Sequence, residues 1–151
     1  MEGVSRGRDQ IWRYLEYSRP GIRNMEIDDF FEELPFVDLL GIELTDIDAG
    51  QAEGYIEMRE ELSWSTDDLM AHSGVTFTLT EVTGAAAAVS LHDPPVFTVD
   101  IDVKYLNTGY GDLRSHAEII RDGEDVGIVE VNVFDEDQSR VSCATIVFQL
   151  T

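Results

Sequence analysis

The tripeptide His72-Ser73-Gly74 begins a predicted helix that carries one carboxylate, Glu81, among apolar residues. The first turn of a helix exposes unpaired backbone N–H groups and a partial positive charge. Small residues at that point let a substrate carbonyl come close to these donors, as an oxyanion site requires. A carboxylate in an apolar setting is costly unless it has a partner or a purpose. Glu81 is therefore the candidate catalytic group, and a solvent-facing Glu81 without a role is the alternative.

Other residues that could do chemistry form no pattern of comparable strength. The sequence contains no Cys-x-x-Cys, no His-Glu-x-x-His and no close pair of histidines, so no metal site is expected. Glycine-rich phosphate motifs do not occur either. His92 and His116 are predicted to be structural, and Cys143 is predicted to be a small core residue of the last strand.

The element that must position Glu81 is a helix predicted over residues 73–92. Its apolar residues recur at steps of three and four and form one stripe: Val75, Leu79, Val82, Ala86 and Val89. Gly84 lacks a side chain at a point where a neighbouring element is expected to come close. Asp93-Pro94-Pro95 ends the helix. The helix is predicted to be buried on more than one side.

Most of the remaining chain is predicted to form strands. Residues 27–40 have helical spacing interrupted by Pro35, Asp48-Ala49-Gly50 is a hairpin signal, and residues 60–71 are predicted to form a loop. The predicted strands are residues 42–48, 51–59, 96–106, 112–121, 125–135 and 140–150. The order helix, two strands, long helix, four strands favours an α+β fold, in which an antiparallel sheet wraps around the long helix.

Two of these strands have faces that can be predicted from their alternation. In 96–106 one face is expected to hold Phe97, Val99, Ile101, Val103 and Tyr105, with Thr98 and the charged residues on the other. In 140–150 the apolar face is expected to hold Val141, Cys143, Thr145 and Val147.

The sequence is strongly acidic. Its 151 residues include 31 Asp and Glu against 10 Lys and Arg, a net charge of −21. Such a surface repels nucleic acid and anionic lipid, so neither is an expected partner. The acids are scattered rather than gathered in a tail, which favours a setting of high salt, where the Debye length falls to about 3 Å at 1 M. We therefore expect a halophilic protein, with an unusually acidic mesophilic protein as the alternative.

Cysteine content and hydropathy limit the cellular compartments in which the protein is expected. A single cysteine cannot form an internal disulfide, and a secreted disulfide scaffold is excluded. No apolar run reaches the roughly 18 to 20 residues that span a bilayer. A soluble, cytoplasmic protein is expected.

Residues 1–24 differ from the rest of the sequence. They hold five of the ten basic residues and a net charge of +2, and Met25 then begins a run that is typical of an amino terminus. The segment is either a short helix docked on the body or an extension upstream of the true start. The predicted organisation is therefore an extension, residues 1–24, and one domain, residues 25–151.

A family resemblance follows from the first motif. His72-Ser73-Gly74-Val75, with an acid nine positions after the histidine, resembles the signature of hotdog-fold acyl-CoA thioesterases of the phenylacetate-degradation and 4-hydroxybenzoyl-CoA types. The segment from Thr98 to Leu106 is similar to that family's strand after the helix. The resemblance covers about residues 36–150. It implies a hotdog fold and hydrolysis of an acyl-CoA to a free acid and CoA, without a metal or another cofactor.

The resemblance also implies catalytic roles. Glu81 matches the family's catalytic acid, which acts as a general base or as a nucleophile on the thioester. Ser73 and Gly74 match two glycines whose backbone N–H groups polarise the thioester carbonyl, and Thr98 matches a hydroxyl residue near the attacking water.

The implied substrate-binding residues are His72, Val75 and Thr66. Three departures from the family pattern accompany them. Ser73 replaces the first glycine, Thr66 replaces a frequent asparagine, and Asn107-Thr108 replaces a basic stretch after the strand. CoA is anionic, so either high salt screens its repulsion by the chain, or cations gather near the entrance: Lys104, Arg114, Arg121 and Arg140.

The spacing within the helix has a consequence for assembly. Glu81 lies seven residues after Gly74, about 10 Å along a helix, so one chain cannot easily bring both to the same carbonyl. Two antiparallel helices across a dimer axis would place Glu81 of one copy beside Gly74 of the other. The resemblance also implies a site at a dimer interface, and a homodimer or a dimer of dimers is expected.

Two other functions stay open. A hotdog hydratase or dehydratase would use His72 with Glu81, but such enzymes usually have a proline-rich stretch before the helix, and residues 63–71 contain no proline. A non-catalytic acyl-CoA-binding or interaction domain would explain the departures at Ser73 and Thr66.

Overall fold

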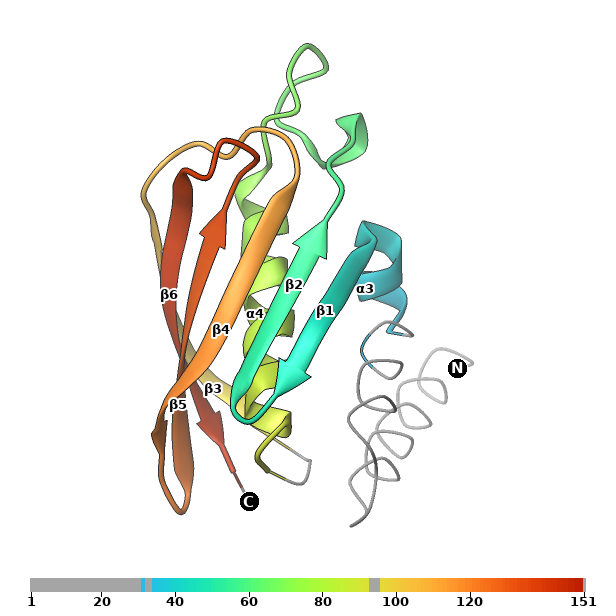
Figure 1. Cartoon of the computed structure of the whole chain (residues 1–151). Coiled ribbons are helices and arrows are strands. Elements are labelled where there is room, and N and C mark those ends of the chain that lie inside the picture. The colour runs from blue at the N-terminus through green and yellow to red at the C-terminus, as the bar shows by residue number, and fades with distance from the viewer. Residues whose placement is uncertain (1–30, 32–33, 93–95, 151) are drawn as a thin grey trace, which may run out of the picture.

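Six strands form one antiparallel sheet that curves around the long helix α4 in the computed structural model, which describes residues 31, 34–92 and 96–150 (Figure 1). The strand order across the sheet is β1-β2-β4-β5-β6-β3, so β1 and β3 are its edges. The elements are α3 (Pro35–Leu40), β1 (Ile42–Asp48), β2 (Gln51–Ile56), the 3₁₀ helix η1 (Glu60–Leu62), α4 (Ser73–Val89), β3 (Phe97–Tyr105), β4 (Leu113–Asp122), β5 (Val126–Phe134) and β6 (Arg140–Gln149). The predicted α+β architecture is confirmed.

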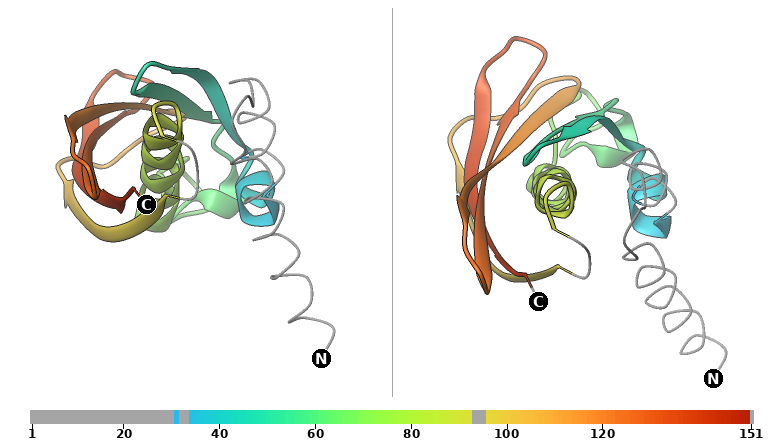
Figure 2. Two further views of the ribbon diagram at one scale, coloured as in Figure 1. Left: turned by 90° about the horizontal axis from the view of Figure 1, so that it is seen from below. Right: turned by 60° about the horizontal axis from the view of Figure 1, so that its bottom comes forward.

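Helix α4 lies on the concave face of the sheet, and an end-on view shows the strands curving around it (Figure 2). All members of the predicted apolar stripe are buried: Val75, Leu79, Val82, Ala86 and Val89. A Cβ at Gly84 would lie 2.6 Å from the Cδ1 atom of Ile146, so glycine allows the close approach of helix and sheet that its position predicted. The core therefore lies between α4 and the inner face of the sheet.

The turn predicted between the first two strands is confirmed. Ala49 and Gly50 have φ angles of 47° and 83° and turn β1 into β2. Helix α3 begins at Pro35, because proline is tolerated in the first turn, and of the predicted helical segment before Leu34 only Phe31 lies within the described residues. Helix α4 ends at Val89, and the prediction that Asp93-Pro94-Pro95 stops it lies outside the described residues.

The register of β6 corrects the predicted face of the last strand. Ser142, Ala144, Ile146 and Phe148 are buried against the core, whereas Cys143 is half-buried and pairs with Asn132 and Lys104 on the outer face. Both sides of this segment are largely apolar, so alternation alone does not distinguish them. Pairing with the buried residues of β5, such as Val131, decides which side faces the helix.

The register of β3 contains a second correction. A register shift between Thr98 and Asp100 interrupts its pairing with β6. Thr98 pairs with the buried Phe148, while Phe97 pairs with the exposed Gln149. Thr98 is therefore on the helix-facing side of the sheet and Phe97 on the outer side, the reverse of the prediction at this end of the strand.

The predicted extension, residues 1–24, lies outside the described residues. Within residues 34–92 and 96–150, no helix is long and apolar enough to cross a membrane.

Candidate active site

Helix α4 begins beside its own cap, the side chain of His72. His72 has an extended backbone with φ −62° and ψ 139°, and its Nδ1 atom accepts a hydrogen bond of 2.9 Å from the backbone N–H of Gly74. The N–H groups of Val75 and Thr76 donate to the carbonyl oxygen of His72 at 2.9 and 3.4 Å. The N–H of Gly74, one of the two donors expected at this helix start, is therefore engaged by the imidazole of His72.

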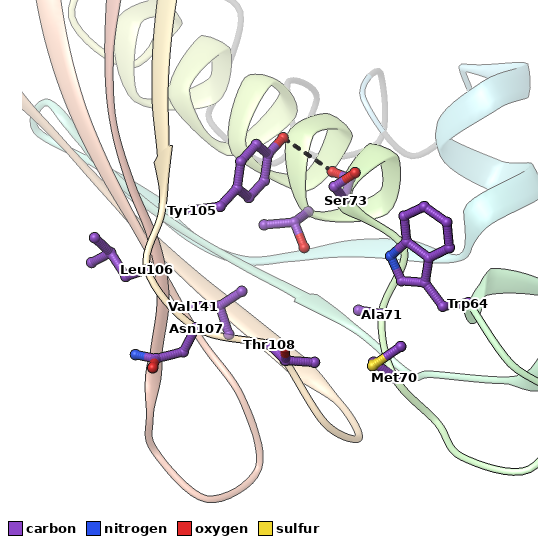
Figure 3. Close-up of a pocket in the computed structure, with 11 residues that line it drawn as sticks. Trp64, Met70, Ala71, Ser73, Tyr105, Leu106, Asn107, Thr108 and Val141 are labelled. Carbon is purple, nitrogen blue, oxygen red and sulfur yellow. Dashed lines mark hydrogen bonds between the residues drawn. The ribbon is translucent and has the colours of Figure 1, made fainter.

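The remaining donor at the helix start is the N–H of Ser73. Within the described part of the chain it has no hydrogen-bond acceptor. The carbonyl oxygen of the same residue accepts a hydrogen bond of 3.2 Å from the hydroxyl of Tyr105, at the end of β3 (Figure 3). Burial raises the pKa of Tyr105, so the phenol keeps its proton and remains a donor at neutral pH. Tyr105 thus joins the edge strand to the peptide unit that follows Ser73.

A tryptophan in the preceding loop holds the cap in place. The indole ring of Trp64 stacks on the imidazole of His72, with ring centroids 4.3 Å apart and an interplanar angle of 27°. The base of this loop is closed by backbone hydrogen bonds, from Trp64 to Met70 at 2.9 Å and from His72 to Leu62 at 3.0 Å. The loop is therefore pinned where it reaches the helix, and the stack restrains the imidazole.

A pocket of about 740 Å³ lies between this loop, the first turns of α4 and the end of β3 (Figure 3). Trp64 and Met70 line it from the loop, and Ser73 and Thr76 line it from the helix. The other lining residues are Ala71, Tyr105, Leu106, Asn107, Thr108, Gly109 and Val141. The N–H of Ser73, which has no acceptor among the described residues, therefore belongs to a residue that borders a space large enough for a substrate group.

Glu81 lies two turns further along α4, half-buried. It shares a strip of the helix with Gly74, Phe77 and Ala85, all of which are at least partly exposed. Phe77 is 38% exposed, although it is a large apolar residue of an otherwise buried helix. Glu81 does not line the 740 Å³ pocket of its own chain, so one copy does not bring the carboxylate and the pocket together.

Three other residues that the sequence predicts for the site do not line this pocket: Val75, Thr66 and Thr98. The side chain of Val75 is buried in the core with an exposure of 6%. Thr66 is exposed in the loop and does not line the pocket, although its neighbours Trp64 and Met70 do. Thr98 lies on the helix-facing side of β3 and is exposed.

The cations predicted to gather at an entrance do not line the pocket. Lys104 forms an ion pair with Asp102 at 2.6 Å, and the hydrogen bond with this carboxylate raises the pKa of Lys104. Arg114 lies over the ring of Tyr55 on the outer face of the sheet, 4.8 Å from its centroid. The histidines predicted to be structural contact carboxylates of neighbouring strands, His92 that of Asp122 and His116 that of Glu53.

The family model that describes the thioesterase superfamily matches residues 70–142. The match begins two residues before His72 and contains the helix start, Glu81, and the strands β3, β4 and β5. This part of the chain belongs to the thioesterase superfamily. As a member of this superfamily it is a hydrolase, and its class of reaction is thioester hydrolysis.

Individual proteins agree with this membership. A relative from Halobacterium salinarum, named "Putative esterase", is 29% identical over 112 residues, which cover 71% of this chain and 74% of the relative. Solved structures of lower identity establish the hotdog fold of this superfamily protein. The E. coli PaaI protein, from the phenylacetic acid degradation operon, has a TM-score of 0.73 at 18% identity, covering 82% of this chain and 88% of its own. A Haemophilus influenzae thioesterase has a TM-score of 0.74 at 17% identity, covering 84% of this chain and 89% of its own.

Two residues of this candidate site, Trp64 and Tyr105, are not predicted from the sequence pattern. Trp64 lies in a polar stretch without a period, where the signal was a single large aromatic residue in a loop. The alternation of its strand predicts Tyr105 on the apolar face, and nothing in the pattern indicates a hydrogen bond with Ser73, 32 residues away.

Proposed function

We propose that this protein hydrolyses an acyl-CoA thioester to a free acid and CoA, at a composite site to which two copies of the chain contribute. The observation that carries the proposal is the position of Glu81. It is half-buried within an otherwise apolar helix, and it lies on the strip of α4 that its own sheet leaves uncovered. Within the described residues its carboxylate has no hydrogen bond or ion pair that would give it a structural role.

Two exposed apolar features support a second copy. Phe77 is 38% exposed one turn before Glu81. The edge strand β3 exposes Phe97, Val99 and Tyr105 by 54%, 62% and 50%. An edge strand with exposed apolar side chains is a surface that another strand or chain covers. A partner copy placed there would bring its Glu81 toward the pocket beside Ser73, and the assembly would be a dimer or a dimer of dimers.

The donor for the thioester carbonyl is assigned to Ser73. Its N–H borders the pocket without an intramolecular acceptor in the described chain, whereas the N–H of Gly74 is engaged by His72. A backbone N–H at a helix start stabilises negative charge that develops on the carbonyl oxygen. Thr98, on the helix-facing side of β3, is kept as the proposed hydroxyl near the attacking water.

The proposed reaction adds one water across the C–S bond. In one route the partner's carboxylate takes a proton from water while the water oxygen attacks the carbonyl carbon. In the other the carboxylate itself attacks, and water then hydrolyses the resulting mixed anhydride. In both routes the C–S bond breaks, the sulfur leaves as a thiolate that takes up a proton, and the products are a carboxylic acid and CoA.

The test is an assay of the full chain against a panel of acyl-CoAs in about 1 M KCl, where surface charge is screened. Glu81→Gln keeps the size of the side chain but removes the base, so kcat is expected to fall by about 10²–10⁴-fold. The matched control is Glu118→Gln, an exposed acid on β4, which is expected to hydrolyse at the wild-type rate. Light scattering is expected to give the mass of a dimer or a multiple of it for all three proteins.

Three outcomes would overturn parts of the proposal. Equal activity of Glu81→Gln and wild type would remove the carboxylate from the mechanism. A monomer that retains full activity would remove the composite site. Binding of acyl-CoAs without hydrolysis of any of them would make the protein a binding module.

A further inference from the structure

The pocket beside the start of α4 has walls of one chemical kind. All 11 residues that line it are uncharged. Trp64, Met70 and Leu106 supply apolar surface, and Thr76 and Asn107 supply a hydroxyl and an amide (Figure 3). Such walls match a ligand portion that is itself uncharged, since a charge taken out of water needs an opposite charge or several hydrogen bonds. The acyl group of a thioester and the adjoining amide-bearing arm have this character.

Four of the five lysine and arginine side chains in the described chain make contacts away from the pocket. Their contacts are Arg59 with the carbonyls of Leu39 and Leu40, Lys104 with Asp102, Arg114 with the ring of Tyr55, and Arg140 with Asn132. The fifth, Arg121, lies near the far end of β4. It follows Arg114 by seven residues, which corresponds to about 24 Å along a strand. The phosphates of a CoA molecule therefore do not meet a prepared cluster of these residues at the pocket.

The surroundings of the pocket are acidic instead. The loop between the lining residues Trp64 and Met70 carries Asp67 and Asp68, both exposed. The chain as a whole has a net charge of −21. A field of this sign raises the free energy of an anionic ligand near the entrance, and the effect weakens as salt is added.

From these observations, and resting on the proposed thioesterase activity, we propose a rule of substrate selection. The protein selects a thioester by its acyl group and the adjoining uncharged arm, and the anionic nucleotide of CoA contributes no favourable binding free energy. Short neutral carriers, such as pantetheine and N-acetylcysteamine, are therefore accepted at least as well as CoA.

The experiment compares kcat/KM for one acyl group carried on CoA and on pantetheine, from about 0.1 M to about 3 M KCl. The full chain is used, so that the arginines of residues 1–24 are present. The readout is the ratio of the two values, because any loss of folded protein at low salt affects both esters equally. At low salt the CoA ester is expected to be about tenfold poorer, within the 10–10³ range of electrostatic effects on association. The two are expected to converge within about threefold at the highest salt, where repulsion is screened.

The opposite salt dependence would overturn this proposal. If phosphate contacts contribute, the CoA ester is the better substrate at low salt and its advantage shrinks as salt rises. Hydrolysis of neither ester would instead overturn the proposed function, so the two failures are distinguishable.

Two variants sharpen the comparison. The backbone carbonyl of Arg140 accepts a hydrogen bond from the side-chain amide of Asn107, which lines the pocket. Arg140→Gln removes the charge at this position, and it is expected to leave the ratio of the two kcat/KM values unchanged. A loss confined to the CoA ester in this variant would contradict the proposal. Trp64→Ala removes a pocket wall and is expected to raise KM for both esters by the same factor.

Discussion

The Nδ1 atom of His72 accepts a hydrogen bond from the backbone N–H of Gly74 at a distance of 2.9 Å. An imidazole nitrogen accepts only when it carries no proton, so this contact belongs to neutral His72 with its hydrogen on Nε2. The cap occupies one of the two N–H groups that the His72-Ser73-Gly74 motif offers. The N–H of Ser73 is the one that borders the pocket unengaged in the described chain.

This relationship predicts the effect of Ser73→Pro. Proline suits the first position of a helix, and the extended backbone of His72 is the conformation that proline favours in the residue before it. The variant therefore deletes the N–H without breaking α4. We expect a thermal unfolding temperature close to that of wild type and a kcat for thioester hydrolysis about 10²–10³-fold lower. Ser73→Ala keeps the N–H and is the matched control; equal activity of the proline variant would assign the carbonyl donor elsewhere.

Gly54 on β2 is predicted to be intolerant of a side chain. A Cβ there would lie 2.5 Å from the hydroxyl oxygens of both Thr83 and Ser115, which are buried and hydrogen-bonded to each other. Gly54→Ala is expected to lower the free energy of unfolding by about 1–3 kcal/mol, as overpacking does in a core. Denaturant unfolding measures the change. Gly127→Ala, where the new Cβ would meet the side chain of Leu150 at 3.2 Å, is expected to lose less.

The Tyr55–Asp112 pair predicts a late phenol titration. The hydroxyl of Tyr55 donates to Asp112 at 2.7 Å, and this hydrogen bond, with desolvation and the nearby negative charge, raises the pKa of Tyr55 to about 12. A pKa raised above the unfolded value of about 10 means that the pair stabilises the fold fully below pH ~10 and loses this contribution as pH rises towards ~12. Absorbance at the phenolate band is expected to show this step near pH 12. Asp112→Asn should move the step to lower pH, and Tyr55→Phe should remove it.

Net charge predicts a dependence of stability on salt. With −21 on 151 residues, self-repulsion destabilises the compact state at low ionic strength. The Debye length falls from about 10 Å at 0.1 M to about 3 Å at 1 M, so thermal unfolding is expected at a higher temperature in molar KCl. Circular dichroism during heating measures this shift. Equal unfolding temperatures in both conditions would contradict the halophilic interpretation of the composition.

Local pattern was sufficient to predict the elements that position the site. The stripe from Val75 to Val89 reports a helix buried against a sheet, because apolar spacing of three and four follows the helix period. The hairpin at Asp48-Ala49-Gly50 and the position of Gly84 were equally readable, since turn geometry and the absence of a side chain are properties of single residues. These features depend on neighbours along the chain.

The faces of the strands depended on neighbours in space. Thr98 faces the helix side because a register shift lies beside it, and Cys143 faces outward because β6 pairs with β5 in one particular register. A shift of one residue exchanges the two faces of a strand, and alternating apolar residues on both faces do not reveal it.

The candidate site likewise depends partly on neighbours along the chain and partly on neighbours in space. The sequence by itself determined that His72, Ser73, Gly74 and Glu81 share one helix and its start. Only the tertiary structure decided which N–H is engaged, that Trp64 stacks on His72, and that Tyr105 reaches Ser73 across 32 residues. Side-chain rotamers and the packing of separate segments decide these contacts, and their energies arise only when the chain has folded.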